Sequence, residues 1–543
     1  MESNKVLVEE QNGFRQDRSC LDHLHALFNT ISYQKSQKKS AFICYVDAKK
    51  AFDNVNRSCL WYKLQKLGIK GKIFSAIKSL YRNVECTVRI NGDLTKWFTV
   101  SNGLKQGCVV SPTLFALYAN DLAEEIKALN CGIPIGEQQI SILMFADDIA
   151  LITDSEDKMQ QMLNTVFRWC RKWRLALNTG KTKIVHYRPE RCERSQFEFM
   201  YGNSKVEITN KNKSLGLWLQ EHQNSSDMVK PLAASASRAL GCLMTKFHNV
   251  GNMTHSVFSH LYDSLVAPIL NYGAGIWGTQ SFSVVNTVQN RACRFFLGVG
   301  KTAGNCATRG DMGWKPQTHR QYAEVLRLYH RAETVDPQRI NSIVHNFCKT
   351  KKARTIWINK VGKLCKRIGY EYEDTSCSSK LYVDKLQECL KLVDQEEWYQ
   401  ELHNDKNCPN GNKLRTYRLH KDRISTEPYV TANISRYERS ILAKLRSGTL
   451  PLEVETGRYR QVPLDERTCK LCQASIENEI HFLVDCHFYN DIRYELFNLL
   501  SIEFPDFNDQ PSTVKYILIM LSSHMVMVGK TVLKMYSRRK LYS

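Results

Sequence analysis

The chain has 543 residues, enough for three or four domains, and its 43% apolar and 24% charged residues exclude disorder as its overall state. Its net charge of +22 favours a polyanionic partner such as nucleic acid. The first ten residues do not resemble a signal peptide, and the most apolar late segment, 516–528, is too short and polar to cross a bilayer, so we expect a protein that is not secreted and whose 19 cysteines are thiols.

The first predicted element is a helix whose apolar face consists of Leu21, Leu24, Leu27, Phe28 and Ile31. Arg15 and Arg18 precede this helix, and their residue type leaves two interpretations open: solvated surface charge, or contact with a phosphate or a template. Residues 41–46 are then predicted to form a buried strand that ends at Asp47.

Two amphipathic helices are predicted next, over 58–67 and 72–82. They are followed by a hairpin, because strand-like residues flank Asn91-Gly92, the strongest short hairpin signal. Another helix is expected to begin at Ser111, with Pro112 in its first turn. Gly103 and Gly107 before it would let the backbone approach a flat partner such as a base pair, or pack within its own domain.

Two aspartates, Asp147 and Asp148, lie between the apolar runs 140–144 and 149–152, which predict a tight hairpin with both carboxylates at its tip. Adjacent like charges favour a divalent cation between them, and hard oxygen ligands suit Mg²⁺. Asp47 is the best candidate for a third carboxylate, which would allow two metal ions as in phosphoryl transfer. The alternative is an ordinary hairpin turn, in which aspartate is common.

A helix is expected from about residue 157 to 177, followed by a strand over 184–187. The alternation of strands and helices along the first 190 residues predicts an α/β fold with acidic positions at strand ends, where such sheets usually hold their sites.

Six motifs in this part of the chain occur in the order and spacing of reverse transcriptases, and the chain specifically resembles the polymerase of non-LTR (LINE-type) retrotransposons. The motifs are Gln11-x-Gly13-Phe14-Arg15, Asp47-x4-Phe52-Asp53, Gln106-Gly107-x3-Ser111-Pro112, Phe145-Ala146-Asp147-Asp148, Asn178-x2-Lys181-Thr182 and Leu215-Gly216. The resemblance implies a right-hand polymerase palm in which Asp47, Asp147 and Asp148 hold two Mg²⁺ (or Mn²⁺) ions.

The resemblance also implies roles around an incoming deoxynucleotide. Ala48 would lend its backbone carbonyl to the metal that the nucleotide binds, and Phe52 would crowd a ribose 2′-hydroxyl. Gln106 and Gly107 would lie against the incoming base pair, and Lys181 would approach the leaving pyrophosphate. The implied reaction is RNA-directed DNA synthesis, in which a primer 3′-oxygen attacks the α-phosphate in line.

The family carries further fingers motifs upstream of the position of Gln11, and often an endonuclease domain before them. We therefore expect partial fingers, an incomplete grip on the triphosphate and a truncated copy. The alternative function is a catalytically inactive, nucleic-acid-binding remnant. Another metal-dependent palm, such as a nucleotide cyclase, is disfavoured because Gln106-Gly107 and Leu215-Gly216 have no role there.

Leu215-Gly216 matches the primer-grip turn of the family, and the helices after it resemble a thumb; 261–273 and 276–278 are similar to a segment common in LINE-type proteins. A basic cluster follows, for which contact with a phosphate backbone and a solvated linker face are both open. It consists of Lys349, Lys351, Lys352 and Arg354.

Cys469-x2-Cys472-x8-His481-x4-Cys486 has the ligand types and spacing of a closed, structural Zn²⁺ site. His487 is an alternative fourth ligand, and free thiols with a core histidine are the alternative to any metal. The arrangement resembles the C-terminal zinc knuckle of the same retrotransposon polymerases, where Arg458 and Arg460 would touch nucleic acid.

We therefore predict five regions: partial fingers and palm (1–190), primer grip and helical thumb (191–335), a basic helical connector (336–440), a zinc-knuckle region (441–500) and a C-terminal helical tail (501–543). The expected partners are an RNA template, a DNA primer or target and dNTPs, with no membrane and with an endonuclease supplied from outside this chain. The expected location is a ribonucleoprotein in the nucleus and cytoplasm.

Overall fold

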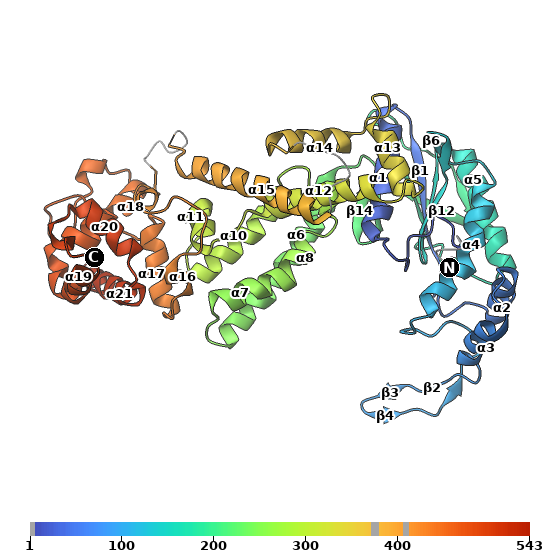
Figure 1. Ribbon diagram of the computed structural model, residues 1–543, viewed down its shortest axis with the longest axis horizontal. Helices are drawn as coiled ribbons and strands as arrows, with labels where there is room; N and C mark the ends of the chain where they lie inside the picture. The colour runs from blue at the N-terminus through green and yellow to red at the C-terminus, as the bar shows by residue number, and fades with distance from the viewer. Residues whose placement is uncertain (1–5, 371–378, 406–411, 543) are drawn as a thin grey trace.

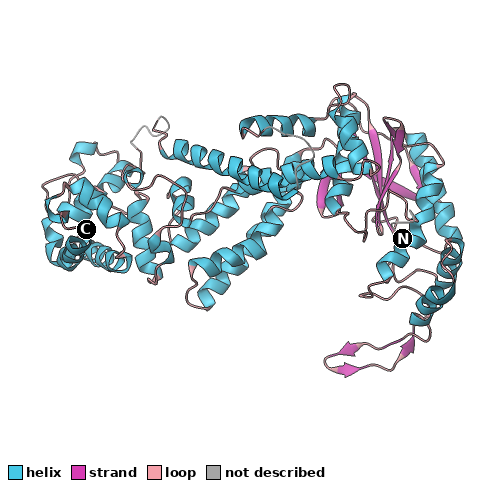
Figure 2. Cartoon of the chain, viewed as in Figure 1, coloured by secondary structure: helices cyan, strands magenta, loops and turns pink. Residues whose placement is uncertain are grey.

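The computed structural model describes residues 6–370, 379–405 and 412–542. The molecule is elongated: the strands gather at the N-terminal end, and helices make up the middle and the C-terminal end (Figures 1 and 2). This agrees with the predicted α/β region followed by helical regions. Within the described part of the chain, every helix is too short or too polar to cross a membrane.

A six-stranded sheet organises the N-terminal region, with β1 (Ala41–Asp47) near its centre. The spatial order is β11-β12-β10-β1-β9-β8, and all neighbours are antiparallel except β10 and β12. The other strands are β8 (Ile142–Phe145), β9 (Asp148–Thr153), β10 (Lys183–Tyr187), β11 (Phe199–Tyr201) and β12 (Ser204–Thr209). The predicted strand over 41–46 and the predicted Asp-Asp hairpin are both confirmed.

The sheet separates two apolar cores because successive side chains of a strand point to opposite faces. Phe42, Cys44 and Val46 of β1 join the core formed with α4 (Ser111–Lys127) and α5 (Glu156–Lys172). Ile43 and Tyr45 join the core beneath α1 (Cys20–Ser36), which continues into the helical part of the molecule. Both faces of β1 are therefore buried, and packing on both sides fixes the position of the strand that ends at Asp47.

The predicted helix over 157–177 is too long. Helix α5 ends at Lys172, because Arg174 adopts a left-handed backbone (φ 58°) and Leu177 instead forms a β-bridge with Ala48. An L residue in that conformation interrupts a helix. The early end of α5 brings the segment after it alongside the end of β1.

A β-hairpin arm projects from this region beyond α2 (Arg57–Lys66) and α3 (Gly71–Leu80) (Figure 1). Asn91 and Gly92 both have positive φ at its tip, as the Asn-Gly pair predicts. The hairpin arm keeps apolar side chains exposed, including Trp97 at 64%. Its short strands are β2 (Glu85–Cys86), β3 (Arg89–Ile90), β4 (Asp93–Leu94) and β5 (Phe98–Thr99).

Two further small hairpins flank the sheet: β6 (Ile133–Ile135) with β7 (Gln138–Ile140), and β13 (Lys211–Ser214) with β14 (Leu217–Gln220). The chain then enters the helical middle of the molecule. Its helices are α6 (Ser225–Asn249), α7 (His255–Leu261), η1 (Tyr262–Val266), α8 (Ala267–Leu270), α9 (Ala274–Trp277), α10 (Ser283–Leu297), α11 (Asn305–Met312), α12 (Gln317–Thr334), α13 (Ile340–Lys349), α14 (Ile356–Arg367) and α15 (Ser379–Leu402).

The end of the predicted thumb and the start of the predicted connector pack back onto the sheet region. Arg331 of α12 binds both carboxylate oxygens of Asp22 in α1 at 2.8 Å, and Arg339 donates to the carbonyl of Asp17 at 2.5 Å. Thr355 donates to Asn29 of α1 at 2.9 Å. A bidentate arginine–carboxylate pair fixes orientation as well as distance. The described connector helices α13 and α14 therefore buttress α1; residues 371–378 and 406–411 of the predicted connector lie outside the described residues.

The basic cluster of this connector lies on the surface. Lys349 is exposed and pairs with the nearly buried Glu333. Lys351, Lys352 and Arg354 follow α13 and are exposed as well. Contact with a phosphate backbone and a solvated linker face therefore both stay open.

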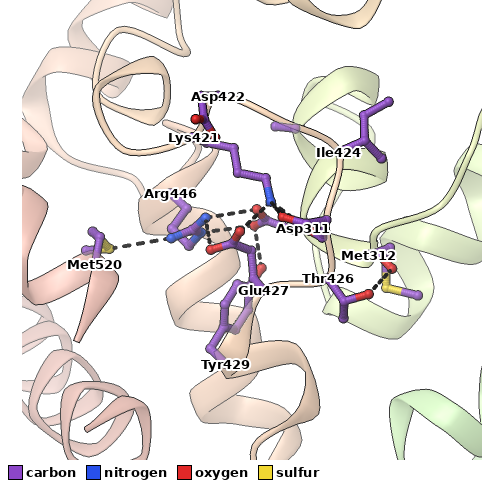
Figure 3. A network of polar contacts seen from close by, with 12 residues as sticks. Asp311, Met312, Lys421, Asp422, Ile424, Thr426, Glu427, Tyr429, Arg446 and Met520 are labelled. Carbon is purple, nitrogen blue, oxygen red and sulfur yellow. Dashed lines mark hydrogen bonds and ion pairs between the residues drawn. The ribbon is translucent and has the colours of Figure 1, made fainter. Parts of the chain in front are cut away.

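The C-terminal region is built from helices and joins α11 through a buried ionic network (Figure 3). Arg446 donates to both carboxylate oxygens of Asp311, at 3.0 and 3.1 Å, and to Glu427 at 2.7 Å. Tyr429 donates to Asp311 at 2.6 Å, and Lys421 pairs with Glu427. The elements are η2 (Tyr417–Leu419), α16 (Pro428–Thr431), α17 (Arg436–Arg446), α18 (Glu453–Tyr459), η3 (Leu464–Glu466), η4 (His481–Asp485), η5 (His487–Tyr489), α19 (Asn490–Glu503), η6 (Phe507–Asp509), α20 (Ser512–Leu521) and α21 (Met525–Leu541).

Candidate active site and metal cluster

Asp47 and Asp148 face each other across neighbouring strands. They are paired positions of the antiparallel β1–β9 ladder, and directly opposed residues of such a ladder have Cβ atoms about 5 Å apart. Asp147 lies in the turn between β8 and β9, where Phe145 pairs with Asp148. Three carboxylates, from two neighbouring strands and one turn, therefore meet where β1 ends and β9 begins.

The hairpin turn is clamped by the segment before α1. Gln11 forms a parallel bridge with Met144, and its side-chain Oε1 accepts hydrogen bonds from the backbone N–H of Ala146 at 2.9 Å and of Gly13 at 2.8 Å. A Cβ on Gly13 would lie 2.4 Å from the Ala146 nitrogen, so only glycine fits there. The motif Gln11-x-Gly13 thus positions the two aspartates, a role that the sequence did not reveal.

The backbone of Asp47 is held by the motif that contains Lys181. Asn178 donates its N–H to the Asp47 carbonyl at 2.8 Å, and the Thr182 hydroxyl accepts from the Asp47 N–H at 3.2 Å. The N–H groups of Lys181 and Thr182 bond the Asn178 carbonyl, which closes a tight turn. This turn carries the exposed side chain of Lys181 to the site.

A cavity of about 200 Å³ adjoins the carboxylates. Asp47, Asp148 and Lys181 all line it, together with Lys213 of β13 and His23 of α1. Burial lowers the pKa of His23 to about 4, so this imidazole is neutral at pH 7. Sequence reasoning missed Lys213 and His23, although Lys213 lies two residues before the Leu215-Gly216 motif, which was the one available signal.

The carboxylates repel one another. Partial burial, followed by the charges of Asp147 and Asp47, raises the pKa of Asp148. The pKa of Asp147 is also raised, chiefly by burial and then by Asp47, against a hydrogen bond from its own backbone. Both effects disfavour the charged forms in the absence of a cation. The ends of β1 and β9 therefore concentrate negative charge beside a cavity that two lysines also line.

Of the remaining predicted nucleotide contacts, Phe52 stacks on Phe115 with ring centroids 4.9 Å apart, and Gln106 donates to Asp53 at 3.0 Å. Gly107 has a positive φ of 77°, with open space where a Cβ would lie. Gln106 lines a second cavity, of about 260 Å³, rather than the one beside the aspartates. Ala48 directly follows Asp47 and bridges Leu177.

Leu215 and Gly216 form the turn between β13 and β14, with positive φ values of 43° and 86°. The hydroxyl of Tyr272 donates to the Leu215 carbonyl at 2.6 Å, and a Cβ on Gly216 would lie 2.7 Å from the Tyr272 ring. This contact joins the turn to the helical middle of the molecule. The turn is next to the cavity, since Ser214 lines it.

The four arginines predicted to touch nucleic acid are not displayed alike. Arg15 and Arg18 are nearly buried, with side chains 4% and 5% exposed, and both pair with Glu9. Arg15 also donates to the carbonyls of Val8 and Gln11. These two arginines stabilise the segment that carries Gln11, and their contact with a phosphate or a template stays a prediction.

Near the cysteine cluster, Arg458 is also mostly buried, beside Glu455, with 13% of its side chain exposed. Arg460 pairs with Glu453 but keeps 53% of its side chain exposed. Of the four predicted contacts, Arg460 is therefore the one that the fold leaves accessible.

A second cluster lies in the C-terminal region. One ligand atom from each of Cys469, Cys472, His481 and Cys486 falls within 4.8 Å of the others, with Cys469 Sγ 4.0 Å from Cys486 Sγ and Cys472 Sγ 3.3 Å from His481 Nε2. Four such ligands at Zn–S distances of about 2.3 Å have mutual separations near 4 Å. His487 is exposed and is not part of the cluster.

Comparison with known proteins was made with this geometry in hand. Residues 1–219 match the family model described as reverse transcriptase (RNA-dependent DNA polymerase). The RNA-directed DNA polymerase from mobile element jockey of Drosophila funebris is 25% identical over 339 residues, which cover 61% of this chain and 36% of that protein. The Pol polyprotein of retrotransposable element R2 from Popillia japonica is 30% identical over 187 residues, covering 34% and 26%.

The chain spans about a third of the length of curated relatives that it matches. Among solved structures, apo telomerase from Candida tropicalis aligns with a TM-score of 0.31 and 13% identity, covering 75% of this chain and 58% of that one.

Proposed function

We propose that this chain, whose residues 1–219 belong to the reverse transcriptase family and whose relatives are polymerases of non-LTR retrotransposons, copies an RNA template into DNA. The observation that carries the proposal is the convergence of Asp47, Asp147 and Asp148 at the ends of β1 and β9, beside a cavity that two lysines line. Three carboxylates with oxygen donors open to solvent suit two Mg²⁺ or Mn²⁺ ions, which leave positions for substrate phosphates. When bound, the two ions would neutralise charge on the attacking and leaving oxygens.

The residues of the chain then have separate tasks. Lys181 and Lys213 line the same cavity as Asp47 and Asp148 and would attract the triphosphate and hold its leaving pyrophosphate. His23 is neutral at pH 7, so it does not compete with the metal ions for the carboxylates. We propose that Phe52, held against Phe115, limits the space for a ribose 2′-hydroxyl, and that Gln106 and Gly107 lie against the incoming base pair.

The remaining assignments extend this proposal to the whole chain. The sheet region would be the palm, the Leu215-Gly216 turn the primer grip and the helices from α6 onward the thumb. The partners would be an RNA template, a DNA primer or target and dNTPs, with an endonuclease supplied by another domain or protein. The working particle would be a ribonucleoprotein of the cytoplasm and nucleus.

Primer extension tests the proposed activity. With poly(rA) as template, oligo(dT) as primer and Mg²⁺ present, the chain is expected to incorporate dTTP and to discriminate against UTP, because of Phe52. Extension is measured on a denaturing gel. A folded chain that binds the template–primer but fails to extend it, whether Mg²⁺ or Mn²⁺ is added, would instead be a nucleic-acid-binding remnant.

We also propose that Cys469, Cys472, His481 and Cys486 hold one structural Zn²⁺. The fit rests on the donor set and its mutual distances, and on four ligands that leave no open position for chemistry. Two arginines outside the cluster stabilise the segment that carries its ligands, residues 469–486. Arg493 donates to the carbonyl of Cys486, and Arg539 donates to both carboxylate oxygens of Glu477 at 2.7 Å. The group would therefore hold the region between α18 and α19 together.

Removal of zinc is expected to loosen this region alone. Binding of a structural zinc contributes directly to folding, so chelation by a strong zinc chelator, or Cys469→Ser, should make the chain after about residue 450 sensitive to limited proteolysis. The zinc content is measured by atomic emission, with one ion expected per chain. Cys192→Ser, at an exposed cysteine outside the cluster, is the matched control. Equal zinc content in both variants would contradict the assignment.

A further inference from the structure

A groove of about 620 Å³ opens in the C-terminal half of the molecule, far along the chain from the aspartate site. It lies between the end of α10 with its following loop, α17 and α21, and its lining includes Arg294, Arg436 and Lys444. The backbone of Gly298 and Gly300 completes one wall. Among the described residues, no acidic side chain lines this cationic groove.

Within the described ranges of the chain, none of the three cations forms an ion pair with a carboxylate; the Arg436 guanidinium lies over the rings of Phe247 and Phe295. Arg294 donates to the Ala303 carbonyl and to Asn305, and Arg436 donates to the Phe295 carbonyl at 3.4 Å, all neutral acceptors. Lys444 is half-buried, and within the part of the chain that the structure describes it has no carboxylate partner. Burial and then the nearby charge of Lys540 lower the pKa of Lys444.

Some nearby cations on the same helices are matched by carboxylates: Arg446 of α17 by Asp311 and Glu427, and Arg538 of α21 by Asp491. The three groove cations have no carboxylate partner in the described segments. A cluster of partly buried cations without an acid is costly, and an anionic ligand would offset that cost. The cationic groove therefore has the electrostatics of an anion-binding site.

Its other lining residues indicate the kind of anion. Phe295 and Tyr536 are partly buried aromatic residues of the lining, with the Arg436 guanidinium 4.8 Å from the centroid of the Phe295 ring. Thr302 and Thr449 add hydroxyl groups. Cations that follow a phosphate backbone, together with aromatic rings on which bases stack, are how proteins bind single-stranded nucleic acid without reading its sequence. We propose that the cationic groove binds the backbone of a single-stranded nucleic acid. α17 and α21 lie at the opposite end of the molecule from the sheet (Figure 1), so this would be a second contact, beyond the polymerase site.

The test compares two charge reversals in the full chain. Lys444→Glu removes a groove cation, and Lys534→Glu makes the same change at an exposed position two residues from Tyr536, which places it on nearly the opposite face of α21. Binding of a fluorescent, unstructured 15-nucleotide RNA, and of DNA of the same sequence, is measured by anisotropy without Mg²⁺ or dNTPs. Lys444→Glu should raise Kd about tenfold and Lys534→Glu less than about twofold. Lys444→Gln should reduce the salt dependence of binding by about one phosphate contact.

Crosslinking locates the bound strand. RNA carrying 4-thiouridine is expected to crosslink to peptides that contain Phe295 or Tyr536 in the unmodified chain, and less in Lys444→Glu. Equal binding by the two charge-reversal variants, or crosslinks confined to residues 1–219, would overturn the proposal. Preferential binding of phosphatidylserine vesicles or polyglutamate over RNA and DNA would overturn the proposal as well. Because binding is read without incorporation, loss of polymerase activity would leave this result standing.

Discussion

Replacing Asp148 with asparagine is expected to lower primer extension at least about a thousandfold. Asparagine keeps the size and one oxygen of the side chain but removes its negative charge. That charge, together with those of Asp47 and Asp147, would hold the metal ions. Incorporation is measured as initial rates at saturating dTTP with Mg²⁺. Asp154→Asn is the matched control, because Asp154 follows the far end of the same strand and pairs with Lys158 at 2.7 Å. It should change the rate less than about twofold.

The same substitution is expected to spare or slightly stabilise the metal-free fold. The folded state binds the Asp148 proton more tightly than the unfolded chain, because burial and the other two aspartates raise its pKa. Stability therefore falls as pH rises through that raised pKa, and an uncharged asparagine side chain removes this loss. Thermal melting without Mg²⁺ should give a midpoint at least as high as that of the unmodified chain. A lower midpoint, or more than a tenth of the activity, would contradict the role of Asp148.

The second large effect concerns the buried network of Figure 3. Arg446→Met is expected to destabilise the C-terminal region by about 3–5 kcal/mol, because it leaves Asp311 and Glu427 buried with Lys421 as their remaining cation. The side chain of Arg446 is 2% exposed, so water cannot replace it without opening the structure. Urea unfolding followed by the fluorescence of Trp398, which packs in one core with Tyr417 beside Arg446, measures the loss.

Two comparisons separate this from a general effect of removing an arginine. Arg538→Met, at an exposed pair with Asp491, should cost less than about 1 kcal/mol. The double variant Arg446→Met with Asp311→Asn should recover part of the loss, because it removes one stranded charge. Strictly additive losses in the double variant would show that Arg446 and Asp311 are not coupled.

Local patterns in the sequence predicted the parts of the fold that depend on neighbouring residues. The apolar run before Asp47 predicts its strand, the two runs around Asp147 and Asp148 predict their hairpin, and Asn91-Gly92 predicts the turn of the hairpin arm; the structure confirms all three. Spacing likewise anticipated the cysteine–histidine cluster, because its four residues lie within 18 positions of one another. In each case the deciding interactions are short in sequence.

Contacts between distant segments escaped the same reasoning. The bond from Ala146 to the Gln11 side chain spans 135 positions, and nothing in the periodicity around either residue signals it. Lys213 and His23 reach the cavity from a strand and a helix whose patterns predict only burial or exposure. The pairing of Arg15 and Arg18 with Glu9 was likewise not predicted, because composition cannot distinguish an arginine that binds a nearby glutamate from one left to solvent.

The return of α12–α14 onto α1 determines where this protein can be divided. A recombinant fragment ending at residue 219, the limit of the family match, would lack Arg331 as the partner of Asp22 and would uncover the apolar side chains of α1 that share a core with α12 and α14. Such a fragment should aggregate on expression. A shorter working unit would have to run to about residue 370, so the smallest piece worth crystallising is larger than its homology suggests.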